Sequence, residues 1–511
     1  MLVKKNNKLL AIIIGSFILI FSWVIINNFF DTSEIVYKLT SYGQVISMIL
    51  YIFLILILSK FVVPKIKNST IAKVSIFTVI LIISIFSACY FRLEIKWENS
   101  EEFTWDMGNV FSTAERLSKK DFSDVNYLKA FPNNIMITLI YAIVLKIASI
   151  FNIQDLILFI TMFNTIIVYL TVFFTYKNAV IISGEKNAML LLIILMFTTP
   201  FYLYTAIFYT DTLSMFFSML ILYSILKIKY ATNKKSRVIY NLLLGMVAFL
   251  GLKVKITSTF IIIALMVYGV MKYDIKLIIK KFIISFITFL VVFSLYGVLI
   301  NTFLIKDGKV NQVPVTHWIL MGLKENGNFN GEDYIYTMSY QTYNEKKNAD
   351  IELIKSRIKN YTIISFLKHI NSKLHFAWGD GTYYAPIKLE RQPHNKGKIH
   401  EFVLRYGKDT KYYKYIPQGM HLGMLVFIVI GAFAIIKNKL YNDNINIALI
   451  FTIYGLIIFL LIWENRSRYV LTILPIMMIV QLSGIDYLSK LKRKGKNKKN
   501  EENISSHTNV L

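Results

Sequence analysis

Cysteine is almost absent from this 511-residue sequence, in which Cys89 is the only one. A single cysteine excludes an intrachain disulfide framework and any metal site built from several thiolates. No cluster of histidines and cysteines has the spacing of a zinc site, and no glycine-rich phosphate loop of the Walker or dinucleotide type occurs. The sequence therefore predicts neither a nucleotide-binding domain nor a zinc centre.

Charged residues are also scarce, at 17% of the chain, whereas a soluble domain carries about a quarter. Hydrophobic residues make up 55%, and they occur in blocks long enough to cross a bilayer, which takes about 20 apolar residues. The first block, 9–30, is too long for the core of a signal peptide and lacks a small-residue cleavage site, so we interpret it as a retained span. The sequence thus predicts an all-α polytopic membrane protein.

Acidic residues are few relative to basic ones, 30 against 57, which gives a formal charge of +27. In a soluble protein this excess would suggest nucleic acid as a partner. Here the lysines and arginines lie in short segments between apolar blocks, as in cytoplasmic loops that face anionic lipid. We therefore expect membrane lipid, and no nucleic acid, among the partners.

The apolar blocks predict about twelve transmembrane helices, with juxtamembrane helices and a larger extracytoplasmic loop region. The predicted spans are 9–30, 43–63, 71–91, 155–176, 187–207, 212–228, 238–253, 256–273, 281–303, 420–437, 445–463 and 469–489.

Charge fixes the predicted orientation. Lys4, Lys5 and Lys8, the basic segments 60–73, 227–237 and 272–281, and the basic tail all lie on the cytoplasmic side if twelve helices cross. The apolar segment 134–151 would reverse every later loop if it were a span, so we predict an interfacial or partly inserted helix there. Both termini are then cytoplasmic, and the protein resides in the plasma membrane.

This topology divides the chain into five regions. We expect two N-terminal spans in 1–70, a transmembrane module in 71–303 with a first outer loop at 92–154, and an extracytoplasmic loop region at 304–419. Three C-terminal spans follow in 420–489, and the basic cytoplasmic tail 490–511 is polar enough to be disordered.

Ionisable residues beside the apolar blocks on the outer side are the candidates for function. Asp106 follows Trp105 after the third span and has the character of a general base, or of an ordinary solvated loop acid. Asp211 lies between two spans and is either a helix N-cap or a second functional acid on the same membrane face. The two acids would provide a base and a positioning group, or share a divalent cation such as Mg²⁺ or Mn²⁺.

Basic residues also occur at outer turns, where positive charge is normally depleted. Lys253 and Lys255 lie at one such turn, and Arg466, Arg468 and Tyr469 lie at another. Snorkelling to headgroups would explain them singly, but two clusters favour binding of a phosphate.

Aromatic residues of the large outer loop form the last set of candidates. His317 and Trp318 lie in one segment, and Trp378 and Asp380 lie in another. They either stack on sugar rings and bind hydroxyls or lie at the headgroup level, as interfacial aromatics do.

The order of these features resembles the type C glycosyltransferase superfamily, in the branch of protein mannosyltransferases and aminoarabinose transferases. The resemblance covers roughly residues 71 to 489 and rests on a series of short motifs: Trp105-Asp106, Phe131-Pro132-Asn133-Asn134, Thr199-Pro200, Tyr209-Thr210-Asp211, Gly251 with Lys253 and Lys255, and Arg466-Ser467-Arg468-Tyr469. The chain differs in its two extra N-terminal spans and in having no Glu directly after Asp106.

The resemblance implies an inverting sugar transfer from a polyprenyl-phosphate-linked donor, with Asp106 as the catalytic acid of the first outer loop and Asp211 as a second acid. Basic residues would hold the donor phosphate, and Trp105, Asn133 and Asn134 would lie at the substrate. The acceptor would be an extracytoplasmic glycan, lipid or protein. The alternatives are a glycan polymerase or ligase of the same fold and a transporter or flippase of lipid-linked sugars, although no internal repeat of the transporter kind is present.

Overall fold

The structure is a computed structural model that describes residues 6–30, 39–95, 105–304 and 312–507, without the side chains of Phe303 and 492–507. Within these ranges the chain is helical, and the one β pairing is an isolated bridge between Leu93 and Pro393. Lys4 and Lys5, which contributed to the predicted orientation, lie outside the described residues.

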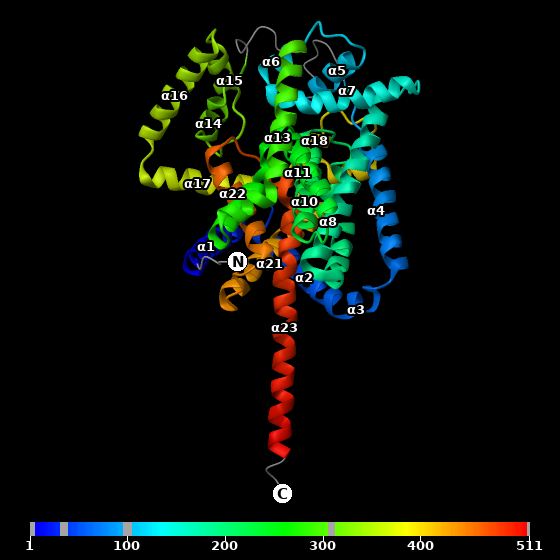
Figure 1. The fold of residues 1–511 in the computed structure, drawn as a ribbon, viewed down its shortest axis with the longest axis vertical. Coiled ribbons are helices and arrows are strands. Elements are labelled where there is room, and N and C mark those ends of the chain that lie inside the picture. Colours follow the sequence, from blue (N-terminus) through cyan, green and yellow to red (C-terminus); the bar gives the residue numbers. More distant parts are fainter. Residues whose placement is uncertain (1–5, 31–38, 96–104, 305–311, 508–511) are drawn as a thin grey trace.

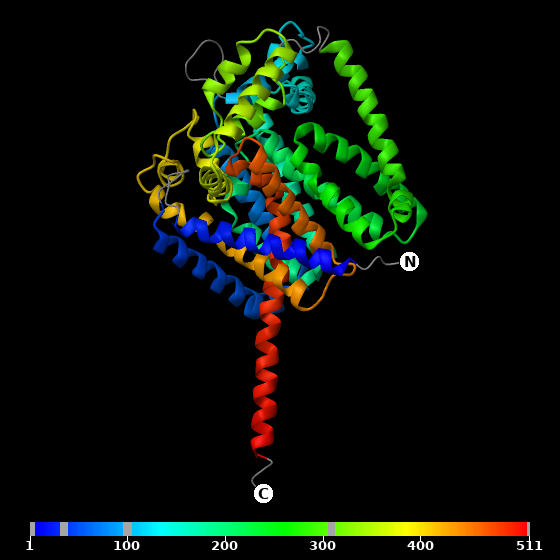
Figure 2. The same ribbon diagram turned by 90° about the vertical axis from the view of Figure 1, so that its left-hand side faces the viewer.

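The long helices form one bundle (Figures 1 and 2). They are α1 (Asn7–Phe30), α2 (Ser41–Ile57) continued by η1 (Leu58–Val62) and α3 (Val63–Ile66), α4 (Thr70–Tyr90), α8 (Leu156–Met196), α10 (Thr210–Lys229), α11 (Lys234–Val254), η3 (Ile256–Thr259) with α12 (Phe260–Lys272), α13 (Ile275–Phe303), α21 (Tyr415–Lys437), α22 (Ile445–Ile462), and η4 (Ser467–Ile473) with α23 (Leu474–His507).

Shorter helices connect or cover the bundle. They are α5 (Trp105–Ser118), α6 (Asn126–Ala130), η2 (Pro132–Asn134), α7 (Ile135–Ile150), α9 (Thr199–Leu203), α14 (Thr316–Gly322), α15 (Gly331–Met338), α16 (Tyr343–Asn360), α17 (Ile363–Trp378), α18 (Ala385–Leu389), α19 (Lys398–Val403) and α20 (Thr410–Tyr413).

Eleven helical stretches of the described chain are long and apolar enough to cross a membrane, close to the twelve expected. The count differs at three places. The predicted spans 155–176 and 187–207 both belong to α8, the predicted span 256–273 is a shorter apolar helix, and Pro132–Ile150 joins the long apolar helices. The prediction of a polytopic all-α membrane protein is confirmed.

Helix α8 is two antiparallel legs joined at Gly184, whose backbone is non-helical (φ 78°, ψ 166°). The side chain of Asn164 in the first leg donates hydrogen bonds to the carbonyls of Tyr204 and Thr205, each at 2.8 Å. Those carbonyls follow the second leg, so the chain must reverse between them. The second leg ends at Met196, earlier than predicted, because Pro200 has no N–H to donate to the Met196 carbonyl and starts the new helix α9.

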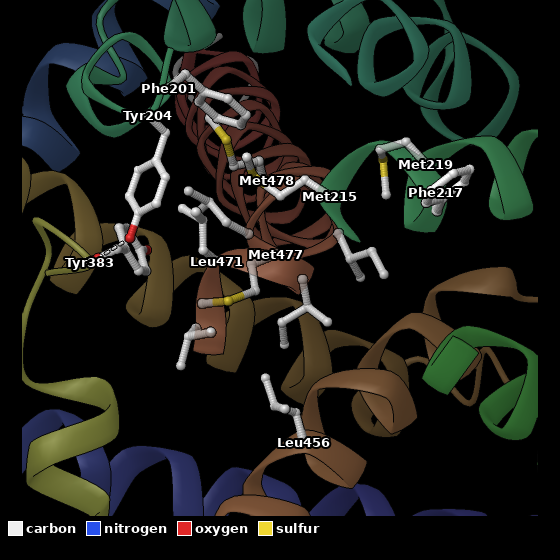
Figure 3. Close-up of a cluster of buried hydrophobic side chains, with 14 of the residues drawn as sticks. Phe201, Tyr204, Met215, Phe217, Met219, Tyr383, Leu456, Leu471, Met477 and Met478 are labelled. Atoms are coloured by element: carbon white, nitrogen blue, oxygen red, sulfur yellow. Dashed lines mark hydrogen bonds between the residues drawn. The ribbon is translucent and has the colours of Figure 1, made fainter. Parts of the chain in front are cut away.

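Helix α23 lies at the centre of the bundle and α13 at its periphery. In the most apolar part of each span, 83% of the residues of Ser467–Leu491 are buried, against 11% in Ile275–Thr302. Figure 3 shows part of the core, in which Met477 and Met478 of α23 lie among side chains from other helices, and the Tyr204 hydroxyl donates to the carbonyl of Tyr383 at 2.7 Å. The positions around α23 are therefore set by protein contacts, and those on α13 face outward.

The two ends of the bundle differ. We call the end from which α23 projects the tail end and the opposite end, with α5–α7 and α14–α16, the loop end (Figure 1). Ionic and polar contacts join the predicted cytoplasmic loops near the tail end: Lys73 pairs with Glu185, Lys229 pairs with Asp443, and Lys272 donates to Asn442. These loops therefore lie together at one end of the bundle.

Helix α7 runs crosswise over the loop end of the bundle, above α4 and α8 (Figure 1). Its sequence is long and apolar enough to span a bilayer, yet its direction supports the prediction of an interfacial helix at 134–151. The chain from α4 to α8 therefore passes over one end of the bundle.

The predicted disorder of the tail 490–511 is not found over its described part, because α23 continues as a helix to His507. Most of this segment is Lys, Arg, Glu and Asn, and it contains no proline. Lysine, arginine and glutamate lose little rotamer freedom in a helix, so a polar composition is compatible with helical backbone.

Candidate functional site, a buried charge cluster at the loop end

Asp211 is the centre of a buried ionic cluster. Its carboxylate is 1% exposed; Lys255 Nζ lies 2.6 Å from Oδ1, and Arg468 Nη1 lies 3.2 Å from Oδ2. The two cations come from separate parts of the bundle, Lys255 from the end of α11 and Arg468 from η4. One carboxylate therefore joins α10 to the next helix, α11, and to η4, 257 residues along the chain from Asp211 to Arg468.

The local backbone conformation positions the charged side chains of the cluster. Helix α10 begins at Thr210 after the extended residue Tyr209, so Asp211 lies in the first turn and is not the N-cap that the sequence analysis considered. A carboxylate there is stabilised by the helix macrodipole. Lys255 is the C-cap residue of α11, with extended backbone, where a cation is favoured for the same reason.

Aromatic rings enclose the ion pairs. The Arg468 guanidinium lies 5.0 Å from the ring centroid of Tyr469 and 5.7 Å from that of Tyr209, and Lys255 Nζ lies 4.7 Å from the Tyr469 ring. The Tyr469 hydroxyl donates to Glu464 at 2.9 Å. Cation–π contacts are strongest where water is excluded, so these rings hold both cations in place.

A chain of hydrogen bonds leads from Tyr209 to Asp106. The Tyr209 hydroxyl donates to Asn134 Oδ1 at 3.1 Å, Asn134 Nδ2 donates to the Tyr127 hydroxyl at 2.5 Å, and that hydroxyl donates to Asp106 Oδ1 at 3.2 Å. Burial, with the charges of Tyr209 and Asp106, raises the pKa of Tyr127 well above its ordinary value. Tyr127 therefore stays protonated, and its hydroxyl donates a hydrogen bond to Asp106.

Asp106 itself lies in the first turn of α5 and is half-buried, between the buried Trp105 and Met107. Among the described residues, Tyr127 is its one hydrogen-bond partner. Asp106 thus differs from Asp211, because one of its oxygens remains available to another donor.

Lys388 is a functional candidate that the sequence analysis missed. This residue of α18 is 3% exposed, and its Nζ lies 3.4 Å from the ring centroid of Trp105, which in turn packs edge-on against Tyr209 at 4.9 Å. Within the described chain no carboxylate or other hydrogen-bond acceptor contacts its ammonium. Nothing in the sequence around it marked it, since it lies in a polar loop with several other basic residues.

Two basic side chains of the cluster, Lys388 and Arg468, are buried without a full set of partners in the described chain. Burial and the nearby Arg468, Arg466 and Arg391 hold the pKa of Lys388 well below its ordinary value, and burial likewise lowers the pKa of Lys255. Arg468 Nε is buried and finds no hydrogen-bond partner in the described part of the chain. An isolated buried cation is costly, so this arrangement is suited to binding an anion.

Arg466 and Asp380 lie beside the cluster. Arg466 Nε donates to Asn328 at 2.9 Å, and its guanidinium lies 5.7 Å from the ring of Tyr384. Asp380 accepts four hydrogen bonds, from the backbone and hydroxyl of Thr382, the backbone of Tyr384 and the hydroxyl of Ser467. Asp380 therefore ties the loop before α18 to the residue before Arg468, which is a structural role.

The remaining candidates lie apart from Asp211. Lys253 faces α13, where its Nζ lies 5.0 Å from the rings of Phe293 and Tyr296. His317 bonds to Thr337 and Trp318 stacks on Trp463, both within the α14–α16 region and its contact with α22. Trp378 is buried against Phe21, and Asn133 is exposed. Trp318 and Trp378 therefore pack against other aromatic side chains of the protein.

A shared divalent cation does not fit the residues. No group of three His, Cys, Asp or Glu in the described ranges has the geometry to hold a metal ion. Both oxygens of Asp211 already contact cationic side chains, so Asp211 cannot also serve as a ligand with Asp106 unless those ion pairs break.

A bundle of long apolar helices, with its ionic groups gathered at the ends, is the architecture of a polytopic integral membrane protein. The chain belongs to the family described as "Conserved hypothetical integral membrane protein", whose model matches residues 2–487. The sequence has no match among curated proteins.

Proposed function

We propose that the protein is an integral membrane glycosyltransferase that transfers a sugar from a polyprenyl-phosphate donor to an acceptor outside the cytoplasm. The observation that carries this proposal is the cluster described above: the half-buried acid Asp106, whose one hydrogen-bond partner among the described residues is Tyr127, lies near the buried Lys388, which contacts no anion in the same ranges. A base for a hydroxyl and a cationic site for a phosphate are the two parts that such a transfer needs.

In the proposed reaction the Asp106 carboxylate takes the proton of an acceptor hydroxyl, and the acceptor oxygen attacks the anomeric carbon. The bond from that carbon to the phosphate oxygen breaks, and the polyprenyl phosphate leaves with the electron pair. One displacement inverts the anomeric centre. The negative charge that develops on the phosphate is stabilised by preorganised cations in a water-poor site.

The contacts of each residue in the cluster define its proposed role in this reaction. Lys388 contacts no anion in the described chain and is the first candidate to contact the phosphate; the charge of Arg468 acts on the same place. Lys255 and Arg468 Nη1 are held by Asp211, which makes Asp211 a positioning residue. Tyr127 orients Asp106 through its hydrogen bond.

The test is transfer from radiolabelled polyprenyl-phosphate sugars to membrane acceptors by the purified wild-type protein and by Asp106→Asn. We expect transfer by the wild type and a loss of about 10²–10⁴-fold in the variant, the usual contribution of a general base. Glu115→Gln is the matched control and should keep full activity, because Glu115 lies on the same helix and its side chain pairs with Lys119 alone among the described residues.

Equal activity in the wild type and Asp106→Asn would remove Asp106 from the reaction. Movement of the labelled lipid across vesicles, with no transfer from any donor, would replace the enzyme by a transporter of lipid-linked sugars.

A further inference from the structure

Helix α17 exposes large apolar side chains although it is not one of the long apolar helices. It has 16 residues, and its first half carries four exposed residues on adjacent positions of the helix. Their exposed fractions are 82% for Ile363, 69% for Ile364, 42% for Phe366 and 59% for Leu367. A contiguous apolar patch of this kind marks a surface that contacts something other than water.

The second half of α17 is fixed to spanning helices. The Trp23 side chain on α1 donates to Asn371 at 2.8 Å, and Asn371 donates to Asn27 at 3.1 Å. Trp23 and Asn27 lie within seven residues of the end of α1 at Phe30, or about 10 Å along the helix axis at 1.5 Å per residue. Helix α17 therefore meets α1 at the level of a predicted span and not beyond it.

A second attachment sets the same level. Lys373 on α17 donates to the carbonyl of Trp463, the C-cap residue of α22, at 2.9 Å. Ile458 and Ile462 in the last turns of α22 are exposed, as residues that face lipid are. From these attachments the first half of α17 projects sideways from the bundle, as the yellow helix beside α22 in Figure 1 shows.

Charge around the patch favours the same partner. The chain has no acidic residue between Glu352 and Asp380, and the exposed Lys359 and Lys368 flank the patch. A helix with an apolar face and basic neighbours lies in the interfacial plane of a bilayer, where lysines reach the headgroups. A second copy of the chain would also cover apolar residues. In such a pair, however, the lysines beside the patch would face lysines of the other copy and not acidic residues.

We propose that the first half of α17 is inserted in the lipid bilayer surface and anchors the α14–α16 region to the membrane. Ile363, Ile364, Phe366 and Leu367 contact acyl chains, and the lysines contact anionic headgroups. This surface is independent of any reaction at the charge cluster, and it concerns the lipid partner alone.

The test uses the full chain with Cys89→Ala and one new cysteine at a time, labelled with a fluorophore in vesicles of phosphatidylcholine and phosphatidylglycerol. The positions are Ile364→Cys on α17, Ile287→Cys on the lipid-facing side of α13 and Lys347→Cys on exposed α16. Brominated acyl chains and aqueous iodide serve as quenchers. The label at position 287 shows the quenching expected in lipid, and the label at position 347 shows the quenching expected in water.

We expect the label at position 364 to be quenched by brominated lipid nearly as well as at position 287, and to be shielded from iodide. Quenching by iodide to the level of position 347 would overturn the proposal, because α17 would then lie in water. Shielding from both quenchers would also overturn it and would indicate a protein partner, such as a second copy. Because each cysteine replaces an exposed residue, all three variants should fold.

Discussion

Lys388 combines deep burial with the absence of a compensating anion among the described residues, and this sets how the cluster should respond to pH. Its pKa lies below that of a lysine in the unfolded chain, with burial as the largest cause. Between the two pKa values the unfolded state binds more protons than the folded state, so the free energy of unfolding rises with pH. Stability is therefore lost as pH falls from about 10 towards the folded pKa.

Replacing Lys388 with Met should reverse this effect. We expect Lys388→Met to be more stable than the wild type at neutral pH, with a gap that narrows as pH rises towards about 10. Thermal unfolding in detergent across this pH range measures it. Lys347→Met, at an exposed lysine, should change neither the stability nor its pH dependence; a wild-type profile unchanged in Lys388→Met would contradict the assignment.

Single residues were the least predictable level. Sequence patterns put Asp106, Asp211, Lys255 and Arg468 on one membrane face, and in the structure Lys255 and Arg468 pair with Asp211. They missed Lys388, whose position depends on the fold of the long loop. They also grouped Lys253 with Lys255, although two residues along α11 turn a side chain to a different face of the helix.

At the scale of elements, the turn within α8 depends on one glycine. The backbone of Gly184 has φ 78° and ψ 166°, a region that is essentially restricted to glycine, whereas no atom would contact an added Cβ. Gly297 on α13 has the same open surroundings, and its φ is not positive. An added Cβ would clash at neither glycine, so a difference between the two alanine variants measures the backbone strain at Gly184.

We expect Gly184→Ala to lower the free energy of unfolding by about 1–3 kcal/mol through strain alone. Gly297→Ala lies within helix α13 and should raise it by roughly 0.5–1 kcal/mol, because alanine loses less backbone entropy in a helix. Chemical denaturation in detergent compares them. Equal effects would show that the reversal between the two legs does not depend on the Gly184 backbone.

The sequence predicted the ends of helices where the composition changes sharply, and it missed the ends that are set by capping hydrogen bonds. The sequence placed the start of one span at 281, but α13 begins at Ile275 because the Asp274 side chain accepts from the Lys276 backbone. The span predicted at 420 begins at Tyr415, since aromatic and polar residues continue the same helix. Apolar content predicts the middle of a span, whereas hydrogen bonds fix its ends.

At the scale of the whole molecule, the orientation follows from whether α7 crosses the membrane. If it lies at the interface, the turn at Lys234 faces the cytoplasm and Lys355 on α16 faces outward; if it crosses, both are reversed. In a Cys89→Ala background, we expect Lys355→Cys to react with an impermeant maleimide in intact cells and Lys234→Cys only after permeabilisation. The reverse pattern would make α7 a span.

The order of synthesis matters for the contact between α2 and α21, which are made far apart in time. Gln44 on α2 accepts from Gln418 on α21 at 2.9 Å, and Gln44 itself donates to the carbonyl of Asn28 at 3.0 Å. At about 5–20 residues per second, α2 leaves the ribosome tens of seconds before α21 exists. During that interval Gln44 can already donate to the Asn28 carbonyl. The hydrogen bond between α1 and α2 therefore forms before α21 is synthesised and packs against them.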